Sequence, residues 1–329
     1  MHDGPVNRPS ARQAFRIGIF LSLFQPVPLL AQEPLDIQYA QHMPLAPQSL
    51  LLDVTAGPGG VLVAVGERGH ITWSADGETW QQAETVPADS TLTSVTAVGD
   101  RLWAAGHDST ILTSGDAGRN WTRQNYDPDR QQPIMDILFL DADHGMAVGA
   151  YGLYLVTFDG GVSWEDGTVS DEEWHLNSLA DLGGGRLFIA GEAGYSYLSE
   201  DAGETWTLLE LPYQGSMWGS VVLAGGCFLA HGLRGHVLQS CDDGQSWQEP
   251  DSGTEASLSG GVFDGQRTVL VGNSGTVVQR DGDGPFTASL HPGGVDFAAV
   301  ISRGDGRFLL VGEDGVHHWP VAAAEDGGP

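Results

Sequence analysis

Short apolar runs recur along the whole chain, each bounded by turns rich in glycine and aspartate. A run such as 61–65 leads into a Gly-x-x-Gly motif, and a second short run such as 70–73 follows it. Runs of this length between turn residues are typical of strands rather than helices. The pattern therefore predicts an all-β protein.

The Gly-x-x-Gly motif repeats at a nearly constant spacing. The repeat that begins at Gly106 has Ser109 in place of its second glycine. The spacings between successive first glycines are 40, 43, 42, 41, 40 and 40 residues, and these glycines are Gly66, Gly106, Gly149, Gly191, Gly232, Gly272 and Gly312. About four short strands in each such period predict a seven-bladed β-propeller with antiparallel blades.

The last repeat ends near Trp319 without room for a fourth strand. Residues 35–39 precede the first repeat, at the place where a fourth strand belongs. We expect this N-terminal strand to pair in the seventh blade, which closes the ring and removes an exposed strand edge. The propeller is then one domain over residues 32–320, followed by a flexible tail at 321–329.

The N-terminus has the order of an export signal. Arg8, Arg12 and Arg16 precede an apolar run at 17–24, and Ala31 comes before a suitable cleavage point. The run is shorter than a membrane span needs, although an uncleaved anchor is the alternative. We expect residues 1–31 to be a signal peptide and the mature protein to be periplasmic or secreted, without direct membrane insertion.

A second motif, which we call the aspartate turn, reads Ser/Thr-x-Asp-x-Gly-x-Ser/Thr-Trp. It occurs with small departures at 74–80, 114–121, 157–164, 199–206 and 240–247. Serine, threonine and aspartate side chains bond nearby backbone amides in tight turns, and tryptophan buries a large apolar area. A catalytic residue is needed once, so five copies indicate a structural role.

Two phrases carry a resemblance to known families. The aspartate turn resembles the bacterial neuraminidase repeat, or Asp box. Residues 136–149, Asp-Ile-Leu-Phe-Leu-Asp-Ala-Asp-His-Gly-Met-Ala-Val-Gly, resemble a phrase of the photosystem II stability and assembly factor propellers, with Met146 where tryptophan is commoner. The resemblance implies an exported, non-enzymatic scaffold for a membrane or envelope protein complex, located in the thylakoid lumen if the host is photosynthetic. It implies no cofactor.

The charge balance narrows the classes of partner. The chain has a formal net charge of −29, and all 14 of its basic residues are arginine. An anion of this size is repelled by DNA and RNA, so nucleic-acid binding is excluded. A hydrophobic fraction of 41% is enough for a folded core.

Candidate partner-binding residues lie in the Gly-x-x-Gly tips and in the loops between blades, which share one face of a propeller. Loops on a rigid scaffold commonly carry binding residues, and Trp, Tyr and Arg are common anchors. The alternative is that these aromatic side chains only cover the blade ends. The candidates are Arg68, His107, Tyr126, Arg130, Tyr151, Trp174, His175, Trp218 and Arg234. Acidic residues also occupy the tips, so a strong anion-binding patch is not expected.

The two cysteines fall on either side of one tip. Cys227 lies five residues before Gly232, and Cys241 lies five residues after His236. They should therefore face each other on neighbouring strands, where an oxidising compartment favours a disulfide. Two buried thiols are the alternative, because directly opposed strand positions fit a disulfide only marginally.

Enzymatic and metal sites have weak support in the sequence. A sialidase-like site needs an arginine triad and a Tyr–Glu pair, and neither stands out. A carbohydrate-active propeller, either a glycan-binding module or a diverged glycosidase, remains the alternative function because many carboxylates are present. Residues 281–284 lack the later ligands of a calcium loop, and His317 and His318 lack a third ligand. We expect a monomer without metal or cofactor.

Overall fold

The computed structural model describes residues 37–321, which belong to one compact unit. The expected signal peptide at 1–31 lies outside the described residues, as does the expected tail beyond residue 321. The described residues form seven antiparallel sheets and contain no α-helix. Among residues 37–321 no helix has the length and apolarity needed to cross a membrane.

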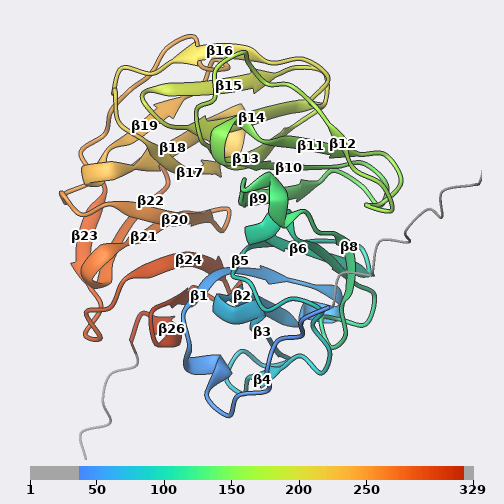
Figure 1. Cartoon of the computed structure of the whole chain (residues 1–329). Coiled ribbons are helices and arrows are strands. Elements are labelled where there is room, and N and C mark those ends of the chain that lie inside the picture. The colour runs from blue at the N-terminus through green and yellow to red at the C-terminus, as the bar shows by residue number, and fades with distance from the viewer. Residues whose placement is uncertain (1–36, 322–329) are drawn as a thin grey trace, which may run out of the picture. The chain divides into compact units, whose positions relative to one another are not determined.

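The seven sheets are the blades of a propeller (Figure 1). Four blades come first along the chain. Blade 1 consists of β1 (Leu51–Ala56), β2 (Leu62–Gly66), β3 (Ile71–Ser74) and β4 (Gln81–Gln82). Blade 2 consists of β5 (Leu92–Val98), β6 (Arg101–Gly106), β7 (Ile111–Ser114) and β8 (Thr122–Asn125). Blade 3 consists of β9 (Ile134–Phe139), β10 (Gly145–Gly149), β11 (Tyr154–Thr157) and β12 (Glu165–Asp166). Blade 4 consists of β13 (Leu176–Gly183), β14 (Arg186–Gly191), β15 (Tyr195–Ser199) and β16 (Thr207–Glu210).

Three blades follow, and two of them have only three strands. Blade 5 consists of β17 (Met217–Val222), β18 (Phe228–Gly232) and β19 (Val237–Ser240). Blade 6 consists of β20 (Leu258–Phe263), β21 (Arg267–Gly272), β22 (Thr276–Asp281) and β23 (Thr287–Leu290). Blade 7 consists of β24 (Phe297–Ser302), β25 (Phe308–Gly312) and β26 (Gly315–Trp319).

The first strand of each blade is the innermost one. These strands contact one another in chain order, and β24 of blade 7 contacts β1 of blade 1, so the ring is complete. The seven-bladed β-propeller predicted from the glycine spacing is confirmed. Short 3-10 turns form most of the tips. Residues 37–321 contain nine such turns: η1 (Ala46–Gln48), η2 (Pro58–Gly60), η3 (Glu67–Gly69), η4 (His107–Ser109), η5 (Pro128–Arg130), η6 (Ala150–Gly152), η7 (Ala224–Gly226), η8 (Leu233–Gly235) and η9 (Asn273–Gly275).

Apolar packing between neighbouring blades forms the core. The second strand of each blade is buried on both faces, as the burial of every residue of β2 illustrates. Seven apolar clusters result, one at each junction between blades. Between blades 4 and 5, for example, Phe188 and Phe228 lie 4.8 Å apart between ring centroids, and Trp247 meets Phe228 edge-on. Adjacent blades therefore stabilise each other through side chains rather than through shared strands.

The aspartate turns are held by their own side chains, as expected. In the turn of blade 4, the Oγ atom of Ser199 donates to Asp201, and the amide of Gly203 donates to that same oxygen of Ser199. Asp201 also accepts from the amide of Thr205. The hydrogen bond from the Thr205 hydroxyl, together with those from the Thr205 amide and Ser199, holds the pKa of Asp201 below its usual value. The turns lie at the end of the blade opposite the Gly-x-x-Gly tips, because Ser74 pairs with Leu62 at the far end of β2.

The predicted closing strand is wrong. Residues 37–40 form no strand, and the amide of Ala40 donates to the carbonyl of Val86 beside blade 1, at 3.0 Å. The side chain of Gln82 bonds the backbone of both Gln41 and Met43, so this segment is held on blade 1 rather than blade 7. Residues 35 and 36 lie outside the described residues.

Side chains and a tip close the ring instead. Leu51 and Ala64 of blade 1 lie in one apolar cluster with Leu309 and Val311 of blade 7. Arg303 of the β24–β25 turn donates to the carbonyl of Asp76 in blade 1. Gly315 lies so close to the segment before β1 that a Cβ atom there would be 2.0 Å from the carbonyl oxygen of Pro47.

Candidate functional site

Each tip places its third residue, which is never glycine, in the left-handed backbone region, and in blade 2 the following Ser109 is left-handed as well. We call these seven residues the tip ring: Arg68, Asp108, Tyr151, Ala193, Arg234, Ser274 and Asp314, with φ between 55° and 60°. The glycine that begins each tip has no space for a side chain, since a Cβ on Gly66 would lie 2.0 Å from the carbonyl oxygen of Leu50. A left-handed residue other than glycine costs about 1 kcal/mol or more, so the surrounding packing must hold these tips.

Four predicted residues lie on this face, in the tips. Arg68 and Arg234 are exposed members of the tip ring, on the non-adjacent blades 1 and 5. His107 is exposed and begins the tip of blade 2. Tyr151 of blade 3 is 53% exposed. The two arginines lie on separate tips, so the structure does not bring them together into one basic patch.

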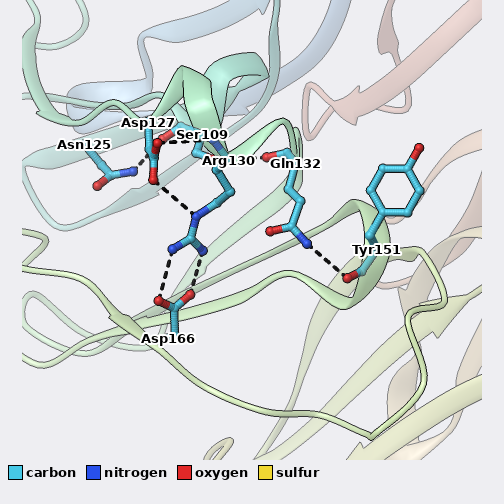
Figure 2. A network of polar contacts seen from close by, with 7 residues as sticks. All are labelled: Ser109, Asn125, Asp127, Arg130, Gln132, Tyr151 and Asp166. Atoms are coloured by element: carbon cyan, nitrogen blue, oxygen red, sulfur yellow. Dashed lines mark hydrogen bonds and ion pairs between the residues drawn. The ribbon is translucent and has the colours of Figure 1, made fainter.

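Arg130 is not free to bind a partner. Its guanidinium forms two hydrogen bonds with the carboxylate of Asp166, at 2.6 and 3.0 Å, and its Nε atom lies 3.5 Å from Asp127 (Figure 2). Arg130 holds the pKa of Asp166 below its usual value. This pairing joins the connection between blades 2 and 3 to β12, and so it anchors the loop that carries Gln132.

A row of rings follows that anchor on blades 3 and 4. The side chain of Gln132 donates to the carbonyl of Tyr151 at 3.1 Å (Figure 2). The ring of Tyr151 meets His175 edge-on, with 4.9 Å between centroids. The backbone amide of His175 is in turn held by the Glu192 carboxylate at 2.8 Å. Tyr151 and His175 therefore form one fixed surface.

Two further predicted aromatic residues, Tyr126 and Trp174, are partly buried. Trp174 packs against Tyr195, with 5.6 Å between ring centroids. Tyr126 lies under the guanidinium of Arg123, at 4.5 Å. These two rings fit the alternative that they cover the blade ends.

The innermost strand of every blade has a β-bulge directly after its first residue. The bulged residues line a central cavity of about 310 Å³, and they are Leu52, Thr93, Met135, Asn177, Trp218, Ser259 and Ala298. Leu51, next to the bulge, pairs with Gly66 of the blade 1 tip. The cavity therefore lies at the tip-ring end of the central channel, which the seven innermost strands surround. Trp218 was predicted as a loop residue, but it lies at the bulge of β17 and is 41% exposed.

Two carboxylates that sequence reasoning missed also line this cavity. Asp53 accepts hydrogen bonds from the amides of Val54 and Val95, so it links blade 1 to blade 2. Asp136 accepts from the Oγ atom of Ser94 and from the amide of Leu179, and links blade 2 to blade 3 and blade 3 to blade 4. Asp136 belongs to the phrase that carried the family resemblance, although no catalytic or binding role was expected for it.

Burial governs the protonation of this pair. Burial, with a smaller contribution from the charge of Asp136, raises the pKa of Asp53 to about 7 against the opposing effect of the hydrogen bonds from Val95 and Val54. Burial also raises the pKa of Asp136. Desolvation penalises the charged form of a carboxyl group, and two carboxylates in one site resist ionising together.

His231 is the third missed residue and is fully buried. Its Nδ1 atom lies 3.1 Å from the carbonyl oxygen of Leu258, across the junction between blades 5 and 6. The corresponding second-strand position is valine or alanine in the other blades. Gly219 and Gly261 leave room for the larger ring, because a Cβ on either would lie within 3.0 Å of Nε2. Because His231 lies within an apolar run of the sequence, it looked like an ordinary core position.

A second hollow lies beside the blade 1 tip. It has a volume of about 310 Å³, and Tyr39, Met43, Arg68 and His70 are among the residues that line it. Burial lowers the pKa of His70, whose Nδ1 atom lies 3.0 Å from Ser49. Tyr39 belongs to the segment that was expected in blade 7, and Met43 follows that segment.

The two cysteines form a disulfide. Cys227 and Cys241 are bonded, and the pairing of Phe228 with Ser240 places them opposite each other as the spacing predicted. No cysteine of the described residues is free.

No group of three or more His, Cys, Asp or Glu side chains suited to a metal ion occurs within residues 37–321. The carboxylates of the channel already accept backbone hydrogen bonds. The geometry thus defines a propeller with one elaborated face, which combines a fixed tip ring, a surface of rings on blades 3 and 4, and a polar cavity at its centre.

The sequence relatives agree with that class. A family model described as "Photosynthesis system II assembly factor YCF48" matches residues 124–223, which run from β8 to β17. The chain is also 32% identical over 177 residues to "Photosystem II assembly lipoprotein Ycf48" of Synechococcus sp. (strain CC9902), an alignment of 51% of this chain and 49% of that protein. The chain therefore spans about half the length of this curated relative. The resemblance to photosystem II assembly factor propellers is confirmed.

Solved structures agree with the fold. "YCF48 bound to D1 peptide" has a TM-score of 0.69 at 16% identity, and covers 83% of this chain and 93% of its own. "YCF48 from Cyanidioschyzon merolae" has a TM-score of 0.66 at 18% identity, with 85% and 96% covered. The WD40 propeller domain of Doa1 reaches 0.68 at 13% identity, with 86% and 94% covered. Since a WD40 domain scores as well, these likenesses establish the propeller and nothing more.

Proposed function

We propose that this chain is an exported, non-enzymatic docking module that holds an extended segment of a membrane protein complex on its tip-ring face. The observation that carries the proposal is the position of the family match. Residues 124–223 include the Arg130 anchor, the surface of Tyr151 and His175, and the exposed Trp218. The part of the chain that resembles an assembly factor is therefore the part that presents fixed aromatic side chains.

The relatives support the kind of partner. The curated relative is named as a photosystem II assembly lipoprotein, and one structural neighbour is described with a D1 peptide bound. We infer that the present chain also engages a peptide segment of a membrane complex. The high negative charge of the chain favours partner segments that carry positive charge.

The geometry suits a binding surface that does not rearrange. Tyr151 has a left-handed backbone and a carbonyl bonded by Gln132, so it is held in place before any partner arrives. Trp218 lies on an innermost strand rather than on a loop. Aromatic anchors that are fixed before binding lose little conformational entropy, which increases affinity.

Location outside the cytoplasm is part of the proposal. The disulfide between Cys227 and Cys241 is typical of an oxidising compartment. An export signal at 1–31 would deliver the chain there, and a periplasmic or lumenal location follows. We propose that the chain is a monomer and that its blade edges away from the tip-ring face bind no partner.

A catalytic use of the channel is the competing function. A glycosidase needs two carboxylates with free oxygens, one to donate a proton and one to act as base or nucleophile. Asp53 and Asp136 converge on one cavity, but each of their four oxygens accepts a hydrogen bond from an amide or from Ser94. Carboxylates held in this way are suited to joining blades, and we propose that the chain is not an enzyme. Turnover of model glycosides, lost in Asp136→Asn, would refute this part of the proposal.

Cross-linking in the native cells tests the docking function. A tagged chain is recovered from solubilised envelope after cross-linking, and captured proteins are identified by mass spectrometry. We expect one membrane complex, with capture reduced at least about tenfold by the double substitution Tyr151→Ala and Trp218→Ala.

A matched control comes from the opposite face. Phe158 is 65% exposed and lies in an aspartate turn, so Phe158→Ala removes an exposed ring without touching the tip-ring face. It should capture as much as the wild type. Equal loss in both variants, or recovery of the propeller alone from wild-type cells, would contradict the proposal.

A further inference from the structure

The disulfide of blade 5 lies at the end opposite the tip ring and is open to solvent. Cys241 belongs to the aspartate turn of this blade and is exposed, while Cys227 is half-buried. The turn that leads into Cys227 is Ala224–Gly226, and all three of its residues are small and exposed. A thiol in solution can therefore approach this bond, as thiol–disulfide exchange requires.

One of the two sulfur atoms has a hydrogen-bond donor beside it. The Nε2 atom of Gln239 lies 3.6 Å from Cys241 Sγ, and its Oε1 atom accepts from Arg280 of blade 6 at 2.8 Å. A guanidinium can only donate, so it holds Oε1 on its own side and directs the amide N–H groups towards the sulfur. Within residues 37–321 this is the one hydrogen bond to a cysteine sulfur, so the two ends of the disulfide differ.

Arg280 brings a positive charge that has no carboxylate partner. The residue is 6% exposed, its Nε atom is buried without a hydrogen-bond partner, and none of the ion pairs of residues 37–321 includes it. Burial lowers the pKa of Arg280 and the charge of Asp283 opposes that shift, but an arginine stays charged near pH 7. Buried charges are normally paired, so this one needs an explanation.

The repeat does not require Arg280. It pairs with Thr268 of blade 6 as Ser74 pairs with Leu62 of blade 1, so it occupies the strand position of the serine or threonine that begins each aspartate turn. Its guanidinium lies over the ring of Phe286 at 4.5 Å and reaches Gln239 of the preceding blade. Arg280 is thus a departure from the repeat that supports the one amide directed at the disulfide.

The acidic side chains that follow Cys241 are engaged elsewhere. Asp242 accepts three hydrogen bonds within its own turn. Asp243 pairs with Arg186. The donor directed at the sulfur is therefore the Gln239 amide, and a donor or a nearby cation stabilises a thiolate.

We propose that the Cys227–Cys241 disulfide is a site of thiol–disulfide exchange with a dithiol oxidoreductase, in which Cys227 is attacked and Cys241 leaves. A thiolate of the partner bonds to Cys227 Sγ, the Cys227–Cys241 bond breaks, and its electron pair passes to Cys241 Sγ beside the Gln239 amide. The second thiolate of the partner then attacks the partner's own sulfur in the mixed disulfide and releases Cys227. The partner's dithiol is oxidised to a disulfide, and its two electrons and two protons pass to the two cysteines.

This exchange does not depend on the docking function, because the disulfide and the tip ring lie at opposite ends of the blades. Reduction would release the cross-link between β18 and β19 while their backbone pairing remains. The oxidoreductase would therefore change the stability of blade 5 without contacting the docking surface.

Reduced glutathione is the first probe, because a monothiol stops at the mixed disulfide. The purified chain is mixed with glutathione at pH 7 under native conditions, released thiols are blocked with N-ethylmaleimide, and the peptides are identified by mass spectrometry. We expect glutathione on Cys227 and maleimide on Cys241, in at least about tenfold excess over the reverse arrangement. The rate should increase in proportion to the glutathione concentration.

Two variants connect the reaction to the named residues. Gln239→Leu removes the donor, and Arg280→Met removes the charge while keeping an apolar chain over Phe286. Each should slow the reaction by about threefold or more and weaken the preference for Cys227. Gln279→Leu is the matched control, because Gln279 holds the same strand position one blade later but bonds Trp319, and it should react as the wild type does. Thermal unfolding checks that each variant is folded, and Gln239→Leu alone suffices if Arg280→Met is not.

A protein probe tests the class of partner. Reduced thioredoxin with its second active-site cysteine replaced by serine should be trapped as a covalent adduct on Cys227. Reaction with glutathione but no trapped thioredoxin would overturn the assignment of a protein partner.

Three other results overturn the exchange site itself. Glutathione found mainly on Cys241, or equally on both cysteines, refutes the assignment of the leaving sulfur. A rate that levels off as glutathione increases would mean that the bond opens only after unfolding. Equal rates for wild type, Gln239→Leu and Gln279→Leu would mean that the amide plays no part.

Discussion

Replacing Asp53 with asparagine tests the electrostatics of the channel wall. Burial raises the pKa of Asp53 from 3.8 to about 7, so the folded protein keeps a proton that the unfolded chain releases near pH 4. The stability that this proton contributes is complete below about pH 4 and is lost as the pH rises through about 7. At 1.36 kcal/mol for each pKa unit, the loss is at most about 4 kcal/mol, and water in the channel makes it smaller.

His231 contributes a pH dependence of the opposite sign. Its pKa falls from 6.5 to about 4, so the unfolded chain binds a proton that the folded protein excludes. The stability from the neutral ring is complete above about pH 6.5 and is lost as the pH falls towards 4. The two groups therefore largely cancel over this range, and the wild type should show a shallow dependence on pH.

The variants remove one contribution each. We expect the free energy of unfolding of Asp53→Asn, relative to wild type, to increase as the pH rises from about 4.5 to 7, while that of His231→Val decreases. Denaturant unfolding followed by tryptophan fluorescence at each pH measures both. The difference from wild type cancels contributions common to all three proteins, such as the aspartates of the turns. An Asp53→Asn profile parallel to that of the wild type would refute the reasoning.

Three further outcomes concern stability away from the channel. The double variant Cys227→Ser and Cys241→Ser should lose up to about 3 kcal/mol for a closed loop of this size, which thermal unfolding with and without reductant measures; reductant should leave the variant unchanged, and an equal effect on both proteins would contradict the assignment. Tyr154→Phe removes a hydrogen bond of 2.9 Å to the carbonyl of Gly203 and should cost about 1 kcal/mol in denaturant unfolding, a neutral result meaning that the bond contributes nothing. Phe228→Ala empties the junction between blades 4 and 5 and should cost about 3–5 kcal/mol in the same assay, whereas a loss below about 1 kcal/mol would show that the junction collapses around the gap.

The propeller could be predicted from the sequence because its determinants are local and repeated. The glycine at the start of each tip, such as Gly66, is required by a contact inside its own blade, so the same letters recur in every blade. The disulfide was predictable for a similar reason, since the register of one hairpin places Cys227 opposite Cys241.

The position of the N-terminal segment and the residues that line the central cavity could not be predicted in this way. Periodicity assigns residues 35–39 to blade 7, but the side chain of Gln82 holds residues 41 and 43 on blade 1, a contact that no repeat records. A β-bulge interrupts the alternation of buried and exposed positions, so Trp218 looked like a loop residue. His231 looked like one more buried strand position, because its partners come from a neighbouring blade.

Of the predicted binding residues, the structure separates anchors from exposed groups. Sequence reasoning treated Arg130 and Tyr151 alike, since both lie in or near tips. The guanidinium of Arg130 is paired with Asp166, whereas the ring of Tyr151 is exposed to solvent. That distinction depends on which blade lies next to which, and only the folded ring supplies it.

The tip ring also has a consequence for how such a face can change over time. Its seven left-handed positions already differ widely in charge and size, from Arg68 to Ala193 to Asp314, although the backbone at each is nearly the same. Glycine follows six of the seven positions and Ser109 follows Asp108, so the tip keeps the same backbone whichever of these side chains the ring position carries. Single substitutions at seven surface positions can therefore adapt this face to a new partner, while the blades stay as they are.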